Sequence, residues 1–328
     1  MPQLDVDAKV PSEEAHWRIC SGWHEARRLP SLPSSSERPL PTPSPPSVTA
    51  KHDAPTKIAH YTPKFPGSGN YMPSRASKHT NKSPRPLKRE TSERVHNTSL
   101  ANYNVNNIKD GVGGGNDSYT MYWGDGSHQR RLAIQKSLCL LRRHSTMFNS
   151  CGWNGWGPNN SGPKVGAIWE GIQKAAGASS VDHRFILAVV MQESSGCVRV
   201  PTTNYGVRNP GLMQDHDGAA SCNDGGKACN PCPSDTIYKM ISEGTAGTDD
   251  GDGLANCING AGGGDVAAFY RAARIYNSGS VSSTGQLQDG IATHCYASDI
   301  SNRHTGWVGA ASECTCDSDP GSCGIKTN

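Results

Sequence analysis

The sequence has no apolar run long enough to cross a bilayer, which takes about 20 residues in a helix. The most apolar candidate in the first half, residues 131–143 (RLAIQKSLCLLRR), could form only a short basic amphipathic helix. The first 20 residues also lack the apolar core of a secretory signal peptide. We therefore expect no membrane partner. The route of export stays open: the true start lies elsewhere, export is unconventional, or the cysteine thiols are reduced.

Several active-site signatures are also missing. There is no Gly-x-Ser-x-Gly elbow, which argues against a serine hydrolase. The glycine triplet at residues 113–115 lacks the Gly-Lys-Ser/Thr context of a phosphate loop. The stretch TDDGDG at residues 248–253 resembles the start of a calcium loop, but no Glu closes it, which favours a solvated loop. The sequence therefore predicts no cofactor and no bound metal.

The two halves of the chain differ in charge and composition. Residues 1–150 carry a net charge of +9 and residues 151–328 one of −6, which gives the chain its +3. Residues 1–110 are rich in Pro and Ser and too poor in apolar residues to offset the entropy of ordering the backbone. We expect a disordered basic arm there, then an uncertain connecting segment at residues 111–150. The basic patch at residues 78–94 could contact a polyanion, but a solvated linker without a nucleic-acid partner is favoured.

Ten of the 12 cysteines fall in the second half of the chain. An even number in a small domain indicates a disulfide framework and an oxidising compartment, so we expect a secreted protein. The alternative is a zinc site at Cys229-x-x-Cys232, but Cys314-x-Cys316 is one residue short of a matching pair. Disulfides are therefore favoured, with a pairing that the sequence does not reveal. The ten cysteines are Cys151, Cys197, Cys222, Cys229, Cys232, Cys257, Cys295, Cys314, Cys316 and Cys323.

The clearest helical pattern begins at Val181 and ends on the carboxylate of Glu193. Asp182 can cap its start, and Gly196 stands where a left-handed residue ends a helix. Glu193 lies at the edge of the apolar stripe, where the helix dipole and the loss of water both favour its protonated form. We therefore expect a raised pKa at Glu193. Such an acid can protonate the leaving oxygen of a glycosidic bond; the alternative is a boundary Glu that reaches solvent.

Further helices are expected on both sides of this one. Apolar spacing predicts a helix from Val165 to about Gly177 and a short one at residues 236–243. Asp265 is expected to cap a third, with one apolar face and with Arg271 and Arg274 on the other. Upstream of them, the aromatic side chains of residues 153 and 156 could stack on sugar rings or cover the core under a loop.

Three short motifs follow one another in the second half of the chain. They are Glu193-Ser194-Ser195-Gly196, Gly211-Leu212-Met213-Gln214 and Tyr276-Asn277-Ser278-Gly279. In order and spacing they resemble the E-S, G-L-M-Q and Y-N-x-G motifs of SLT-type lytic transglycosylases and goose-type lysozymes, in the lysozyme-like superfamily (glycoside hydrolase family 23). The resemblance covers residues 151–314 and not the first 150.

The resemblance implies roles for the residues of these motifs. Glu193 would be the catalytic acid, and Tyr276 would point its hydroxyl at it. The G-L-M-Q strip would form one wall of the sugar cleft, with backbone groups near residue 213 and the Gln214 side chain facing the substrate. Thr202 would replace a serine that many SLT enzymes carry near the acid, although Thr203 could serve instead. The implied substrate-binding residues are Ser194, Thr202, Gly211, Met213, Gln214, Tyr276 and Asn277.

The loop between the first two motifs contains no Asp or Glu. Ordinary glycosidases need a second carboxylate as nucleophile or base. Here the nearest ones are Asp215 and Asp217, which flank His216, the position that the spacing from G-L-M-Q selects. This favours a mechanism in which Glu193 acts first as acid and then as base, with help from the 2-acetamido group of the substrate.

Together these features predict a mainly helical (α+β) lysozyme-like domain at residues 151–316, with two lobes, a substrate cleft and disulfide staples, followed by a tail at residues 317–328. We expect a monomeric enzyme that cleaves β-1,4 linkages of an N-acetylhexosamine polymer. Peptidoglycan is the leading substrate, and neutral chitin competes because the acidic domain does not attract an anionic wall. The alternatives are a non-catalytic sugar-binding protein and a polyanion binder that acts through the arm.

Overall fold

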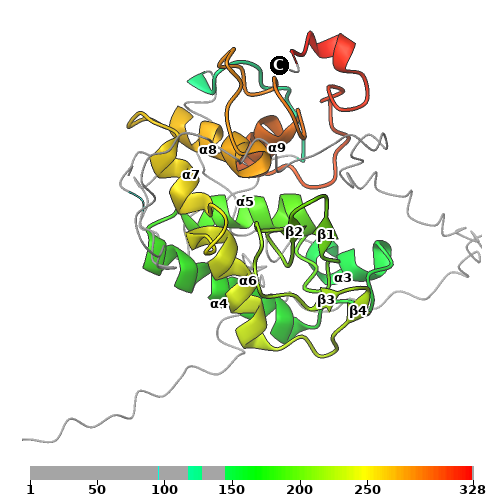
Figure 1. Cartoon of the computed structure of the whole chain (residues 1–328). Helices are drawn as coiled ribbons and strands as arrows, with labels where there is room; N and C mark the ends of the chain where they lie inside the picture. The colour runs from blue at the N-terminus through cyan, green and yellow to red at the C-terminus, as the bar shows by residue number, and fades with distance from the viewer. Residues whose placement is uncertain (1–94, 96–116, 128–144, 327–328) are drawn as a thin grey trace, which may run out of the picture. The chain divides into compact units, whose positions relative to one another are not determined.

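A computed structural model of the chain describes residue 95, residues 117–127 and residues 145–326. They form a helix-rich unit with two short antiparallel hairpins (Figure 1), so the prediction of a mainly helical fold is confirmed for this part of the chain. The expected arm, except for Val95, and the expected helix at residues 131–143 lie outside the described residues. The helices are α3 (Ser145–Trp153), α4 (Gly162–Ser179), α5 (His183–Ser194), α6 (Ser234–Ala246), α7 (Leu254–Gly260), α8 (Ala267–Ser278), α9 (Tyr296–Thr305) and the 3-10 helix η2 (Pro320–Cys323). The strands are β1 (Thr203–Asn204) paired with β2 (Arg208–Asn209), and β3 (Asn223–Asp224) paired with β4 (Lys227–Ala228).

Helix α5 runs through the middle of this unit, with α4 and α6 on one side and α8 and α9 on the other (Figure 1). All of its residues are buried except Glu193. The cap at Asp182 is confirmed, because its side chain accepts the backbone N–H of Arg184 at 2.8 Å. The left-handed residue that ends the helix is Ser195 (φ 51°), one position earlier than expected. Gly196 follows with φ 72°, and a Cβ there would lie 2.8 Å from Met147, so the close packing at this turn also requires glycine.

Helices α4 and α6 pack closely against each other because a glycine stands at their contact. The predicted helix from Val165 is confirmed as α4, whose buried face carries Val165, Ile168 and Ile172. A Cβ at Gly171 would lie 2.8 Å from Cδ1 of Ile241 in α6. The short helix expected at residues 236–243 is longer than predicted, since α6 begins directly after Pro233 and continues to residue 246.

Helix α8 corrects one expectation about its charged side chains. It ends at Gly279 (φ 79°) as predicted, and Asp265 accepts the backbone N–H of Ala268 at 3.3 Å. Arg274, expected on the polar face, is fully buried. Its guanidinium donates to the carbonyls of Asp289 (2.8 Å), Ile291 and Thr293 (2.7 Å). The helical spacing places Arg274 on the polar face of α8, but the backbone carbonyls of the later loop cover that part of the face and bury the side chain.

Residues 117–127, which we call the strap, pack along α9. The Tyr119 ring meets the Trp307 ring edge-on at 4.9 Å between centroids. The carboxylate of Asp117 accepts three consecutive backbone N–H groups, those of residues 308, 309 and 310, at 2.8–2.9 Å. Farther along, Leu287 donates its backbone N–H to the carbonyl of Gly124 at 2.8 Å. The folded unit therefore includes residues that precede position 151.

Four disulfides confirm the expected framework for eight of the ten cysteines. Cys229 and Cys257 form no disulfide. The zinc alternative at Cys229-x-x-Cys232 is wrong, because the Cys232 sulfur is bonded to Cys222. The pairs are Cys151–Cys197, Cys222–Cys232, Cys295–Cys314 and Cys316–Cys323. Within the described ranges, no helix is long and apolar enough to cross a membrane.

Candidate functional site

The site is built around the end of α5, where Glu193 is the one residue of the helix that reaches the surface. The hydroxyl of Tyr296, at the start of α9, donates to Oε1 of Glu193 at 2.5 Å. The adjacent Ser194 is buried, and its hydroxyl donates to the carbonyl of Val190 at 2.8 Å. The Ser194 hydroxyl is therefore bound within the last turn of the helix. Its predicted contact with substrate stays a prediction.

The pKa of Glu193 is raised from its ordinary value to about 7, in the direction that the sequence predicts. Loss of water around the carboxylate is the main cause, and the Tyr296 hydrogen bond and the positive charge of Arg303 oppose it. Near neutral pH the carboxyl is thus divided between its protonated and ionised forms. A group in that state can donate a proton and later take one back.

The tyrosine that bonds to Glu193 is not the one that the resemblance implies. Tyr276 of α8 donates its hydroxyl to the carbonyl of Met213 at 2.8 Å, whereas Tyr296 bonds to the acid. Tyr276 still lies near the acid, because the charges of Glu193 and Asp215 both contribute to raising its pKa. The hydroxyl of Tyr276 therefore ties the G-L-M-Q strip to α8 beside the acid. Sequence reasoning missed Tyr296, which belongs to no motif and stands 103 residues after Glu193.

The G-L-M-Q strip makes a tight turn beside α6. Gly211 has φ 71°, and a Cβ there would lie 2.6 Å from Cγ of Met240, so only glycine fits. The Met213 side chain is fully buried. The Gln214 amide is held inside the loop, since its Nε2 donates to the carbonyls of Pro201 (3.2 Å) and Gly211 (3.0 Å). The expected contact between this amide and a sugar stays a prediction and would require the amide to exchange partners.

The two candidate threonines have different neighbours. Thr203 donates its hydroxyl to Oε1 of Gln214 at 3.0 Å, so it belongs to the strip. Thr202 donates to the hydroxyl of Ser221 at 3.0 Å. The structure thus joins the alternative residue, Thr203, to the motif. The predicted role of Thr202 remains untested.

Asn277 supports the loop that follows α8. Its Oδ1 accepts the backbone N–H of Thr293 at 3.1 Å and an Nη1 hydrogen of Arg274 at 3.3 Å. The side chain is partly exposed. Its implied contact with sugar stays a prediction.

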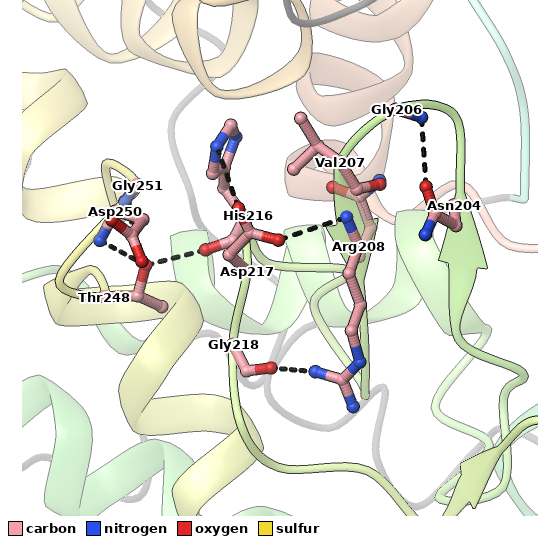
Figure 2. Close-up of polar contacts among 11 residues, drawn as sticks. Asn204, Gly206, Val207, Arg208, His216, Asp217, Gly218, Thr248, Asp250 and Gly251 are labelled. Atoms are coloured by element: carbon pink, nitrogen blue, oxygen red, sulfur yellow. Dashed lines mark hydrogen bonds and ion pairs between the residues drawn. The ribbon is translucent and has the colours of Figure 1, made fainter.

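The carboxylates next to the strip differ in accessibility. Asp215 is buried, and both its oxygens lack a hydrogen-bond partner within the described residues. Burial and the negative charge of Glu243 raise the pKa of Asp215 well above its usual range. Asp217 is exposed and accepts the backbone N–H of Arg208 at 3.2 Å, while the carbonyl of His216 accepts the Thr248 hydroxyl at 2.7 Å (Figure 2). Asp215 is therefore closed off from substrate, and Asp217 is committed to the hairpin that contains β2.

One group of side chains has the spacing of a metal site. The sulfurs of Cys295, Cys314 and Cys316 lie within 4.8 Å of one another. All three take part in disulfides, so they offer no thiolate to a metal.

Comparison with known proteins gives no family. No protein-family model, no curated protein and no solved structure matches the chain.

Proposed function

We propose that the described unit is a lysozyme-like glycosidase or lytic transglycosylase that cleaves β-1,4 linkages of N-acetylhexosamine polymers, with peptidoglycan as the substrate. The observation that carries the proposal is the state of Glu193. It is the one residue of α5 that is not buried, its pKa is raised to about 7, and the Tyr296 hydroxyl donates a hydrogen bond to its carboxylate. These are the properties of a general acid that must donate a proton near neutral pH.

The proposed reaction uses Glu193 twice. Its protonated carboxyl donates the proton to the bridging oxygen as the bond from that oxygen to C1 breaks, which leaves an oxocarbenium-like sugar. The 2-acetamido group of the same sugar stabilises this cation. The Glu193 carboxylate then takes a proton from the hydroxyl that attacks C1. That hydroxyl belongs to water, which gives hydrolysis, or to the sugar's own C6, which gives a 1,6-anhydro end.

The neighbouring carboxylates support this single-acid scheme. Asp215 is buried without a hydrogen-bond partner in the described part of the chain, and Asp217 is bound to the backbone of Arg208. Neither is arranged as the second carboxylate that ordinary retaining or inverting enzymes use. The four disulfides support the further proposal that the enzyme works outside the cell, in an oxidising compartment.

Chitin is the second candidate substrate, and one observation favours it. The second half of the chain carries a net charge of −6, which does not attract an anionic wall over long range. A neutral polymer escapes this repulsion. The two candidates share the linkage and the acid, and they differ in the charge of the polymer.

The test is product analysis with purified protein. Peptidoglycan and chitin oligomers are incubated in parallel with the parent and with Glu193→Gln, and the products are identified by mass spectrometry. We expect shortened products from the parent alone, and a 1,6-anhydro end or its absence distinguishes the two fates of the cation. Equal cleavage by Glu193→Gln would refute the proposal. Oligosaccharide binding by both proteins, with no product from either, would indicate a non-catalytic sugar-binding protein.

A further inference from the structure

The strap meets α9 at the residues that lie behind Glu193. The Tyr119 hydroxyl donates to Oδ1 of Asp299 at 2.6 Å and also lies 3.1 Å from the hydroxyl of Ser298. The backbone N–H of Thr120 donates to Oδ1 of Asn302 at 2.8 Å. Because Tyr119 is 5% exposed, its hydroxyl is removed from solvent.

From Asp299 a chain of buried hydrogen bonds leads to the end of α5. Oδ2 of Asp299 accepts from Nε2 of Gln192 at 3.0 Å. Oε1 of Gln192 in turn accepts from Nε of Arg303 at 2.7 Å. Gln192 directly precedes Glu193, and the positive charge of Arg303 lowers the pKa of Glu193. A buried carboxylate and a buried guanidinium thus stand together behind the proposed acid.

We propose that Tyr119 is a positioning residue for Glu193: through the docked strap it holds Asp299 as a carboxylate, which offsets the charge of Arg303 behind the acid. This rests on the proposed function of Glu193. It adds the strap, which precedes all three motifs in the sequence, to the candidate site. Normal titration of Glu193 then requires the strap to be packed on α9.

The direction in which Tyr119→Phe shifts the pKa of Glu193 follows from the hydrogen bond to Asp299 and the charge of Arg303. Burial and the charge of Asp317 raise the pKa of Asp299, and the Tyr119 hydroxyl, Arg303 and Gln192 lower it, with a result of about 7. Removing the Tyr119 hydroxyl leaves Asp299 buried but takes away a hydrogen-bond donor to its carboxylate. The pKa of Asp299 therefore rises, and a larger fraction of it is neutral near pH 7. A neutral Asp299 no longer offsets the positive charge of Arg303. That charge then favours ionised Glu193 more strongly and lowers its pKa.

The groups that face Glu193 come from two helices and leave this sign unchanged. Tyr296 and Arg303 of α9 both lower the pKa of Glu193, and Tyr276 of α8 lies close enough to be affected by its charge. Within the described residues, the Tyr119 hydroxyl bonds to Asp299 and Ser298 and to none of these three side chains. The Tyr119 ring also reaches Arg303 through Trp307, but Tyr119→Phe keeps that contact, so loss of the hydroxyl acts on Glu193 through Asp299.

The test compares two variants of the strap in the full chain. Tyr119→Phe keeps the ring that packs on Trp307 and removes the hydroxyl. Tyr122→Phe removes a hydroxyl from the same strap, where only the backbone N–H, not the side chain, bonds to Ser298. The Glu193 carboxyl is titrated by carbon NMR, with Glu193→Gln used to assign its signal. We expect a pKa lower by a few tenths of a unit in Tyr119→Phe, and the alkaline limb of activity moved down equally; Tyr122→Phe leaves both in place.

A second variant covers a failure of Tyr119→Phe to fold. Asp117→Ala removes the clamp on residues 308–310 and loosens the strap. It should move the Glu193 titration in the same direction. An unchanged or higher pKa of Glu193 in a folded Tyr119→Phe protein, or failing that in Asp117→Ala, overturns the proposal. The titration needs no turnover, so its failure is distinct from failure of the proposed function, which an active Glu193→Gln protein would reveal.

Discussion

Glu193 and Asp215 are both carboxyls with raised pKa values, and both lie near enough to Tyr276 for their charges to affect it. Their surroundings differ. Glu193 is partly exposed, receives a hydrogen bond from Tyr296 and has Arg303 behind it. Asp215 is 2% exposed, its oxygens have no hydrogen-bond partner within the described ranges, and the charge of Glu243 raises its pKa by more than the charge of Arg208 lowers it.

The difference shows that burial alone does not make a proton donor. Burial raises the pKa of either carboxyl, but only Glu193 combines that with a path to solvent and a group that fixes its orientation. Asp215 has the first property without the other two. We therefore expect Glu193 to serve the reaction, and we expect Asp215 to affect mainly the stability of the fold.

The largest expected effect is the contrast in activity between two isosteric variants. Glu193→Gln should lower kcat on the cleaved polymer by roughly 100- to 10,000-fold, because general acid catalysis contributes about that much. Asp215→Asn should stay within about tenfold of the parent, since its side chain does not reach the substrate. Initial rates on the same oligomer measure both. A loss in Asp215→Asn as large as that in Glu193→Gln would make the two carboxyls partners and end the distinction between them.

The closed surroundings of Asp215 predict a cost for any added volume there. A Cβ at Gly218 would lie 1.9 Å from Oδ2 of Asp215, so Gly218→Ala should lower the free energy of unfolding by about 1–3 kcal/mol. Denaturant unfolding measures this. Gly166→Ala is the matched control, because a Cβ in that part of α4 meets nothing within 4 Å and helical Ala is favoured over Gly by about 0.5–1 kcal/mol. Equal stability of Gly218→Ala and the parent would mean that Asp215 has room to move.

The raised pKa of Asp215 predicts a pH-dependent stability. A carboxyl whose folded pKa is raised contributes its full stability below the unfolded value, about 3.9, and loses it as pH rises through the folded pKa. Asp215→Asn removes this loss, so its unfolding free energy relative to the parent should increase from pH 4 to pH 8. The exposed Asp217→Asn serves as the control for removing a charge from the same loop. A constant difference between Asp215→Asn and the parent across that range would contradict the assignment.

The sequence was sufficient for features that depend on local spacing. Apolar periodicity and Asp182 predicted α5, and the position of Glu193 at the edge of the stripe predicted its raised pKa. These features follow from a few consecutive residues, so their physical cause is visible in the sequence.

Features that depend on distant segments were not predictable in the same way. Tyr296 reaches Glu193 only because α9 packs beside α5, and no spacing rule connects residues 103 positions apart. Arg274 has the spacing of a surface residue, but the carbonyls that bury it come from a later loop. The strap contacts Asp299 across 180 positions. In each case the partner is selected by tertiary packing.

The smallest expected effect concerns the bond that distinguishes the two carboxyls most directly. The Tyr296 hydroxyl stabilises the ionised form of Glu193, so Tyr296→Phe should raise the pKa of Glu193 above about 7 and move the alkaline limb of activity to higher pH. Tyr276→Phe, which removes a bond to Met213 instead, is the control and should leave that limb in place. The pH dependence of kcat measures both. The direction is opposite to that expected for Tyr119→Phe. A downward shift in Tyr296→Phe would show that the hydroxyl stabilises the protonated acid, and the contrast with Asp215 would then not depend on a donor that favours the ionised form.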